Sequence, residues 1–277
     1  MINYDLIIDG KYLSETLPGV SLSSFRPEAP VFERQTAGTN ALINGTMMLK
    51  QGNTGRYTER KINIKVIVEA NSSYQFQIKR DAVYNLFIRE DPYYVINTQQ
   101  PYKRWLVTCD DAFSIYQENG KKYQEVDITL TAIQGLAESL NDSTASMELK
   151  DEKFHLGMNI RRDSTPVFHF QNKNSFVVDN IGDVRLDPIN YNYNVEMYLQ
   201  GTDISITNIT TNETLTLNGK FSKTDKITLL KHHILKNSTP ISDRSGRFPT
   251  LAAGQNQFRI AGATYSDIRF ITHFYYK

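Results

Sequence analysis

The chain has 277 residues, and its 31 lysines and arginines against 30 aspartates and glutamates give a formal net charge of +1. Hydrophobic residues make up 40% of it, the level of ordinary globular proteins, which excludes a disordered scaffold. A protein that grips nucleic acid electrostatically carries a basic excess in one domain, whereas residues 1–140 hold 15 basic and 16 acidic side chains. At roughly 150 residues per domain, this length predicts about two domains.

The first ten residues include Asp5 and Asp9 and no basic residue, which is not the pattern of a secretory signal. No apolar run in the sequence approaches the ~18 residues that a membrane-spanning helix needs. We therefore expect a chain that is made in the cytoplasm and is not inserted into a membrane.

Residues 38–57 show neither strand nor helix periodicity. They hold four glycines, and the apolar residues Ile43, Met47 and Met48 lie between these glycines. A loop of this length inside a compact domain is unusual unless it acts outside that domain. We expect a protruding arm used in assembly, and a plain surface loop is the alternative.

Residues 61–69 alternate between polar and apolar side chains. The even positions are all apolar, while Lys61, Asn63 and Lys65 occupy odd positions. This pattern predicts a strand with one face on a core and the other toward solvent or a partner.

Residues 74–90 are predicted to form one helix. Asn71-Ser72-Ser73 can cap its start, and Asp91-Pro92 must end it. Apolar residues at helical spacing predict a single buried stripe. This stripe contains Tyr74, Ile78, Ala82, Leu86, Val83 and Phe87.

Further strands are expected at residues 93–98 and 104–109. A hairpin should follow, with residues 113–117 joined to the alternating residues 125–132 through Asn119-Gly120, because Asn-Gly supplies the two positive-φ residues of a tight turn. Together these elements make a first domain of the α+β type, residues 1–136.

Composition changes at residues 137–153, which are small and polar without a sustained period, and we interpret them as a linker. After them only strand patterns occur, for example in residues 191–199 and 268–276. Many short strands at this spacing predict a β-sandwich over residues 154–277. The expected fold class is therefore mainly β, with one helix in the first domain.

Candidate catalytic and metal-binding groups are sparse. The one cysteine, Cys109, lies in an apolar run, which predicts an inert, half-buried thiol. His232 and His233 would point to opposite faces of a strand, and residues 179–183 lack the spacing and the closing glutamate of a calcium loop. The sequence contains no nucleophile elbow, phosphate loop or dinucleotide motif. We expect no enzyme, with no catalytic residue, metal or cofactor.

Aromatic residues are numerous, with 16 tyrosines and 14 phenylalanines. Tyr191 and Tyr193 fall on the apolar register of their strand, whereas Tyr198 and Tyr275 fall on the opposite register. Outward aromatic rings suit protein–protein interfaces and saccharide platforms alike, and scattered exposed rings are the alternative. Tyr198 and Tyr275 are therefore candidate contacts for a sugar or a protein partner.

Several stretches occur in a fixed order along both halves of the chain. They are the Asp9-Gly10 hairpin, the central helix, residues 101–107, residues 176–188 and residues 246–258. In this order they resemble the distal tail proteins (Dit) of siphophages that infect Gram-positive hosts. The most specific stretch is Phe-Pro-x-Leu-x-x-Gly-x-Asn, from Phe248 to Asn256.

This resemblance implies a belt domain, residues 1–136, that closes into a hexameric ring, and a galectin-like β-sandwich, residues 154–277. Such a ring is the baseplate hub at the tail tip of the virion. It joins the major tail tube protein to the tail-associated lysin or fibre protein, with a receptor-binding protein as a further partner, and DNA crosses its lumen only in transit. The near-neutral charge suits a conduit that does not grip DNA.

We expect ring closure through a head-to-tail interface that uses the strand at residues 61–69 and the arm. The candidate interface residues are Lys61, Asn63, Lys65, Ile43, Met47 and Met48. The alternative is a carbohydrate-binding module, or a receptor-binding adaptor of the tail tip, that uses Tyr198 and Tyr275 of the second domain.

Overall fold

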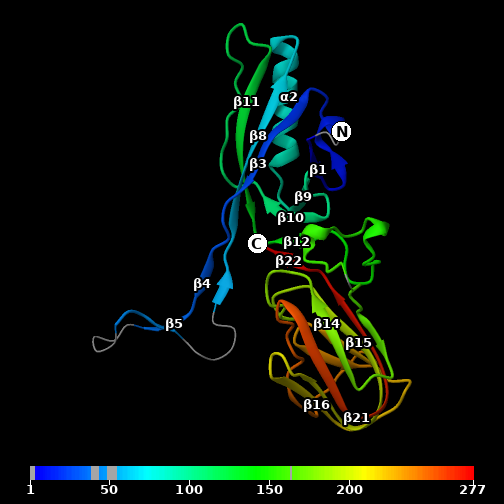
Figure 1. Cartoon of the computed structure of the whole chain (residues 1–277). Coiled ribbons are helices and arrows are strands. Elements are labelled where there is room, and N and C mark those ends of the chain that lie inside the picture. Colours follow the sequence, from blue (N-terminus) through cyan, green and yellow to red (C-terminus); the bar gives the residue numbers. More distant parts are fainter. Residues whose placement is uncertain (1–3, 39–43, 49–54, 163) are drawn as a thin grey trace. The chain divides into compact units, whose positions relative to one another are not determined.

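The structure is a computed structural model that describes residues 4–38, 44–48, 55–162 and 164–277 (Figure 1). The chain divides into two compact units, Met1–Ala137 with Lys277, and Glu138–Tyr276. Most elements are strands and one helix is long, so the predicted mainly β fold is confirmed. None of the helices in the described part of the chain is long and apolar enough to cross a membrane.

The first unit is built on one antiparallel sheet with the strand order β2-β1-β9-β10-β11-β8-β3, accompanied by two short ribbons, β4–β7 and β5–β6. Its elements are β1 (Leu6–Ile8), β2 (Lys11–Tyr12), α1 (Leu13–Thr16), β3 (Val20–Pro27), β4 (Phe32–Arg34), β5 (Thr36–Gly38), β6 (Met47–Met48), β7 (Gly55–Tyr57), β8 (Arg60–Glu69), α2 (Ser73–Phe87), β9 (Tyr93–Asn97), β10 (Lys103–Thr108) and β11 (Tyr123–Ala132).

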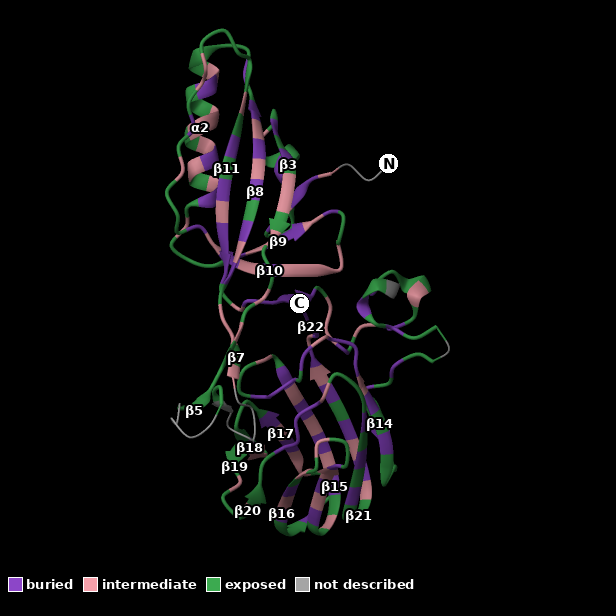
Figure 2. Ribbon diagram, turned by 60° about the vertical axis from the view of Figure 1, so that its left-hand side comes forward, coloured by how far each residue is buried: buried purple, intermediate pink, exposed green. Residues whose placement is uncertain are grey.

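Strands β8 and β11 pair along ten residues each. On β8 the even positions from Ile62 to Val68 are at most 1% exposed, while the odd positions are half-buried or exposed. Figure 2 shows this alternation along both strands. The predicted strand at residues 61–69 is confirmed, and α2 lies along β8 and β11 in both views (Figures 1 and 2).

Helix α2 begins where the sequence predicts, because the Ser72 side chain accepts a hydrogen bond from the Gln75 backbone N–H at 3.2 Å. The predicted buried stripe is only partly correct. Val83 and Phe87 are buried together with Phe76, whereas Tyr74 and Ile78 are 79% and 53% exposed. Each residue turns a helix by about 100°. Tyr74 and Ile78 lie two residues before and two residues after the buried Phe76, so both lie on the opposite face of the helix.

The predicted hairpin before β11 is wrong in its first half. Gly120 has the positive φ of a tight turn, but residues 113–117 do not form a strand. The ring of Phe113 packs against that of Tyr84 with centroids 5.3 Å apart, and the backbone N–H of Ile115 donates to the Tyr84 hydroxyl at 3.1 Å. Packing on α2 therefore holds this segment, and β11 pairs with β8 and β10 instead.

The second unit contains a sheet with the order β13-β21-β15-β17-β18-β19, to which β14 is added on β21, and β16 with β20 on β15. Strand β12 (Ala137–Ser139) spans the boundary of the two units in the sequence. The remaining elements are the 3₁₀ turns η1 (Leu149–Asp151) and η2 (Leu156–Met158), β13 (His169–Gln171), β14 (Ser175–Asn180), β15 (Tyr193–Asn208), β16 (Glu213–Phe221), β17 (Lys226–Leu230), β18 (His233–Lys236), β19 (Thr239–Pro240), β20 (Arg244–Gly246), β21 (Gly254–Thr272) and β22 (Tyr275–Tyr276).

The two longest strands, β15 and β21, bend in the middle and so serve both halves of this sheet. Their pairing shifts register around Gly201, and Gly262 has φ +80°. A Cβ atom at Gly201 would lie 2.0 Å from the carbonyl oxygen of Gly262, so the two backbones approach as closely as only glycine permits. The alternating segment expected at residues 191–199 is therefore the first part of one longer strand that continues to Asn208.

The core of the second unit is a cluster of aromatic rings from different strands. Phe176 stacks on Phe170 with centroids 4.2 Å apart and on Phe258 at 5.6 Å, and Phe258 meets Phe270 edge-on at 5.4 Å. All four rings are buried. Offset and edge-to-face pairs of this kind add to the free energy gained by burying their area.

Residues 137–153 differ from the solvated linker that their composition indicates. Their small polar side chains bind the last strands of the second unit. The Ser139 backbone N–H donates to the Phe274 carbonyl at 2.7 Å, and the Ser143 hydroxyl donates to the Phe270 carbonyl at 2.8 Å. Low hydrophobicity here reflects hydrogen bonding to neighbouring backbone rather than exposure.

Cys109 follows β10 and is buried, with its thiol 3.9 Å from the Thr129 carbonyl oxygen. Burial, together with the smaller effect of the neighbouring carboxylates of Asp110 and Asp111, raises the pKa of this thiol to about 11. The thiolate is the reactive form, so this arrangement disfavours nucleophilic chemistry at Cys109.

We predict that Phe76→Ala lowers the free energy of unfolding by roughly 3–5 kcal/mol, because it empties a buried ring site between α2 and the sheet. Tyr74→Ala, on the exposed face of the same helix, should change it by about 0.5 kcal/mol or less. Denaturant unfolding of both variants checks this. Equal losses would show that the exposed face is packed in solution.

We also predict that iodoacetamide alkylates Cys109 of the folded chain about 300-fold more slowly than in the unfolded chain near pH 7, given an unfolded thiol pKa of about 8.5. The folded-state rate should rise about tenfold per pH unit until the pH reaches the raised pKa. Mass spectrometry of timed samples measures both rates. Rapid labelling of the folded chain at pH 7 would contradict the burial.

Candidate assembly surface

The outward side chains of β8 form a hydrogen-bonded ladder with those of β11. Lys65 pairs across the strands with Asp127, and its Nζ lies 3.1 Å from Glu125 Oε2 and 3.7 Å from Asp127 Oδ1. The hydrogen bond to Glu125, followed by the charge of Asp127, raises the pKa of Lys65 above its ordinary value. Lys65 thus stays charged throughout the physiological range.

The same face continues through Asn63. The Thr129 hydroxyl donates to Asn63 Oδ1 at 3.2 Å, and Asn63 Nδ2 donates to Glu28 Oε1 at 3.3 Å. One rung further, Lys61 Nζ donates to Asp111 Oδ2 and to the Thr131 hydroxyl, both at 3.0 Å.

The structure therefore brings Lys61, Asn63 and Lys65 together on one polar face. The hydrogen bond that Lys61 donates to the Asp111 carboxylate raises the pKa of Lys61, and partial burial opposes this shift. The polar groups of the ladder described above are matched by one another within the chain, so the face can recognise a partner only by exchanging or bridging these hydrogen bonds.

Strand β3 is the edge of the sheet beside this face. Its pairing with β8 shifts register between Leu22 and Ser24, which marks a bulge, and the strand closes on Pro27. An edge strand offers unpaired backbone groups, and bulges and prolines limit which strands can add to it. This edge is therefore a selective site for β-pairing.

The arm expected at residues 38–57 is present in part, as ribbons that continue from β3 and β8 (Figure 1). Phe32 and Tyr57 meet edge-on with centroids 5.0 Å apart, and Arg56 Nε lies 2.9 Å from Glu33 Oε2. None of the side chains of β4, β5 and β7 is buried. A two-stranded ribbon without a core is only marginally stable on its own in water.

Three residues of the arm, Ile43, Met47 and Met48, are candidate contacts in the ring interface. Met47 and Met48 form β6, opposite Gly38 and Thr36 of β5. Ile43 lies outside the described residues. The role of these three residues in a ring interface stays a prediction.

Tyr198 and Tyr275, the candidate contacts of the second unit, do not form one outward platform. Tyr198 is half-buried on the outer face of β15, as predicted, but Tyr275 is only 1% exposed. Its ring packs on Tyr191 with centroids 4.5 Å apart, and its hydroxyl accepts the Asn192 backbone N–H at 3.1 Å. The prediction for Tyr275 is wrong because β21 ends at Thr272, so the strand's alternation no longer applies at residue 275.

Two of the stretches that carry the family resemblance are organised by buried asparagines. Asn180 Nδ2 donates to the carbonyls of Val184 at 2.8 Å and Leu251 at 3.3 Å. Asn256 Oδ1 accepts a hydrogen bond from the Ala252 backbone N–H at 2.8 Å, and Asn256 Nδ2 donates one to the Ala252 carbonyl at 2.8 Å. These side-chain amides make the hydrogen bonds that water would make to the loop backbone if the fold did not bury it.

The asparagines also explain the acidic stretch at residues 179–183. The Asn180 side-chain oxygen accepts the Gly182 N–H at 3.0 Å, which makes this stretch a hydrogen-bonded turn. Within the described residues, no group of three or more His, Cys, Asp and Glu side chains could hold a metal ion.

Residues 53–132 match a family model described as the phage tail protein RIFT-related domain. This segment includes β8, α2 and β11, and so contains the polar ladder. No curated protein sequence matches the chain.

Among solved structures, the chain is similar to SPP1 Dit, described as a paradigm of hub adsorption apparatus in Gram-positive infecting phages. The TM-score is 0.62 at 13% identity, over 98% of this chain and 99% of that chain. Chains of the phage p2 baseplate in its activated conformation, with Sr or with Ca, give TM-scores of 0.41 and 0.35 at 10% identity over 97% and 98% of both chains, too low to support an argument. The resemblance is confirmed: residues 53–132 match the family model of the phage tail protein RIFT-related domain, and the chain has the fold of SPP1 Dit, a siphophage distal tail protein.

Proposed function

We propose that this chain is a structural protein of a phage tail tip, where six copies close into a ring that serves as the baseplate hub. The observation that carries the proposal is the similarity in fold to SPP1 Dit along 98% of the chain, together with the tail-protein match over residues 53–132. A hub binds copies of itself and adjoining tail proteins and converts no substrate. An extended polar sheet face and a ribbon without a core suit that role.

Ring closure requires a head-to-tail interface in which two different patches of the same chain meet. The first patch is the arm, which lacks a core of its own. The second is the polar face of β8 and β11 with the adjoining edge strand β3. Covering the arm against a neighbour would remove its exposed apolar groups from water, which is the main favourable contribution in association.

The near-neutral charge of the chain, with 31 lysines and arginines against 30 aspartates and glutamates, also suits the proposed passage of DNA through the ring. A conduit without an excess of cations would not retain phosphates. The tube protein above and the lysin or fibre protein below are the proposed partners in the tail.

We predict that removing the arm abolishes the ring and leaves the subunit folded. Arg34 and Gly55 are cross-strand partners, so an Asn-Gly turn can replace residues 35–54 and close the ribbon directly. Light scattering on a sizing column should give about 190 kDa for the intact chain, six copies of 31.8 kDa, and one copy for the shortened variant.

The shortened variant should keep the circular dichroism spectrum and the cooperative unfolding of a folded subunit, because no described side chain of β4, β5 or β7 is buried. An intact chain that stays monomeric at micromolar concentration would contradict the ring. A shortened variant that still forms the ring would contradict the role of the arm.

We further predict that Asn63→Trp prevents formation of the hexameric ring. The bulky indole side chain, in the middle of the polar face, would hold a neighbouring subunit away. The matched control is Asn85→Trp, the same change on the exposed side of α2. Sizing with light scattering should show the ring for the control and single subunits for Asn63→Trp. Assembly of both variants, or failure of both, would contradict a specific role for this face.

A further inference from the structure

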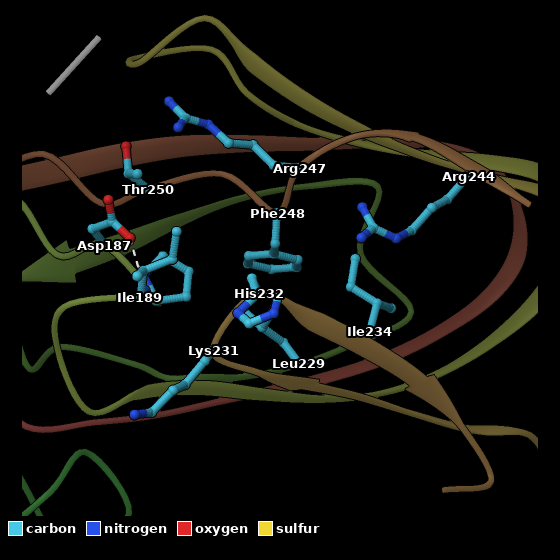
Figure 3. A pocket seen from close by; sticks show the side chains of 11 residues that line it. Asp187, Ile189, Leu229, Lys231, His232, Ile234, Arg244, Arg247, Phe248 and Thr250 are labelled. Carbon is cyan, nitrogen blue, oxygen red and sulfur yellow. Dashed lines mark hydrogen bonds between the residues drawn. The ribbon is translucent and has the colours of Figure 1, made fainter. Parts of the chain in front are cut away.

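A pocket of about 170 Å³ lies in the second unit, between the turn that joins β17 to β18 and the segment at residues 244–250 (Figure 3). Phe248 lies at its centre, with Ile189, Leu229 and Ile234 around the ring. Phe248, Leu229 and Ile234 are buried, and Ile189 is exposed at the mouth. A cavity of about 150 Å³ lined by such residues holds a benzene ring, so the pocket accepts one apolar side chain.

Three cationic side chains surround this apolar floor (Figure 3). Lys231 makes no ion pair or hydrogen bond within the described residues, and Arg244 donates only to the carbonyl of Gly246, at 3.1 Å. Arg247 is paired with Glu213, whose Oε1 lies 2.6 Å from its Nη2. Two of the three cations are therefore without a carboxylate partner.

The anionic groups near the pocket are already engaged. Glu213 accepts from Arg247 and from the Thr250 hydroxyl, at 2.6 Å each. Asp187 Oδ1 accepts the Ile189 backbone N–H at 2.8 Å. With Lys231 and Arg244 counted, the rim carries an excess of positive charge that a carboxylate on an incoming group would match.

The backbone at the rim provides a separate observation. Lys231 has φ +54°, a left-handed conformation that side chains other than glycine, asparagine and aspartate rarely adopt. A glycine at this position would remove the strain, but it would also remove the cation. Strain of this kind is often found where a side chain serves binding.

We propose that the pocket binds an acidic peptide segment of another protein, which inserts one apolar side chain against Phe248 and sets its carboxylates against Lys231 and Arg244. A saccharide fits less well, because sugar hydroxyls need many hydrogen-bonding partners. Here the floor is apolar, and the Thr250 hydroxyl and Asp187 Oδ1 are already engaged. The site lies within the second unit, so it does not depend on ring formation.

The test is methyl NMR on the full-length chain, labelled at Ile, Leu and Val methyl groups. The probe is the peptide Glu-Asp-Glu-Phe-Glu-Asp-Glu. Signals of Ile189, Leu229 and Ile234 should shift and saturate, while the exposed Val177 of β14 should not move. The same peptide with Ser in place of Phe should bind more weakly, and a Lys-Arg peptide around Phe should not bind.

Variants separate binding from stability. Lys231→Gly should weaken peptide binding about two- to fivefold, the size expected for one exposed ion pair, without lowering the thermal midpoint. Ile189→Glu and Ile189→Lys remove the same apolar side chain with opposite charge, so binding should be weaker for Ile189→Glu than for Ile189→Lys.

Poly(glycerol phosphate), tested in parallel, distinguishes an anionic polymer from a peptide. Peptide shifts that do not saturate at millimolar concentration would overturn the proposal. Pocket shifts that are as large with poly(glycerol phosphate), or unchanged affinity in Lys231→Gly with equal affinities for the two Ile189 variants, would overturn it as well. None of these outcomes bears on the proposed hexameric ring, which is tested separately by the molar mass from light scattering.

Discussion

The ten-residue pairing of β8 with β11 determines which side chains of the first unit face its core and which face outward. The side-chain period of a strand is two, so a slip of one residue would exchange Ile62 and Ile64 with Lys61 and Asn63 and place charges in the core. The buried side chains and the ladder of Lys65 with Glu125 both require the same register. The proposed assembly surface is therefore the reverse side of the core and changes only if the core does.

In the second unit, the corresponding constraint is the close approach of β15 and β21 at Gly201 and Gly262. The bend lets two strands supply both halves of the sheet, and it leaves the connecting segments at residues 181–192 and 247–253 to be held by side chains. Asn180 and Asn256 do this through hydrogen bonds to buried carbonyls. Phe248 lies in the second of these segments and lines the pocket together with residues of the β17–β18 turn.

Sequence periodicity predicted the strands well, because burial on one face imposes a period of two that neighbouring elements do not alter. It failed where a second contact decides the outcome. The burial of Phe76 leaves Tyr74 and Ile78 on the exposed side of α2, and packing of Phe113 on Tyr84 takes the place of a predicted strand. The end of β21 at Thr272 removes the alternation that placed Tyr275 outward, and its ring is buried. The pocket could not be predicted at all, since its residues come from segments about 60 positions apart that only the folded sheet brings together.

The two proposed interfaces differ in how they would gain affinity. Exposed ion pairs such as those of Lys65 contribute little stability because water screens them, so a polar ladder would give a ring its register while the covered arm would supply most of its stability. The pocket is small and would hold a single peptide only weakly. Six copies in a ring would present six pockets at fixed spacing, and a partner with several acidic segments would then bind through its summed contacts. Assembly would thus convert a weak site into a firm attachment, with no change in the pocket itself.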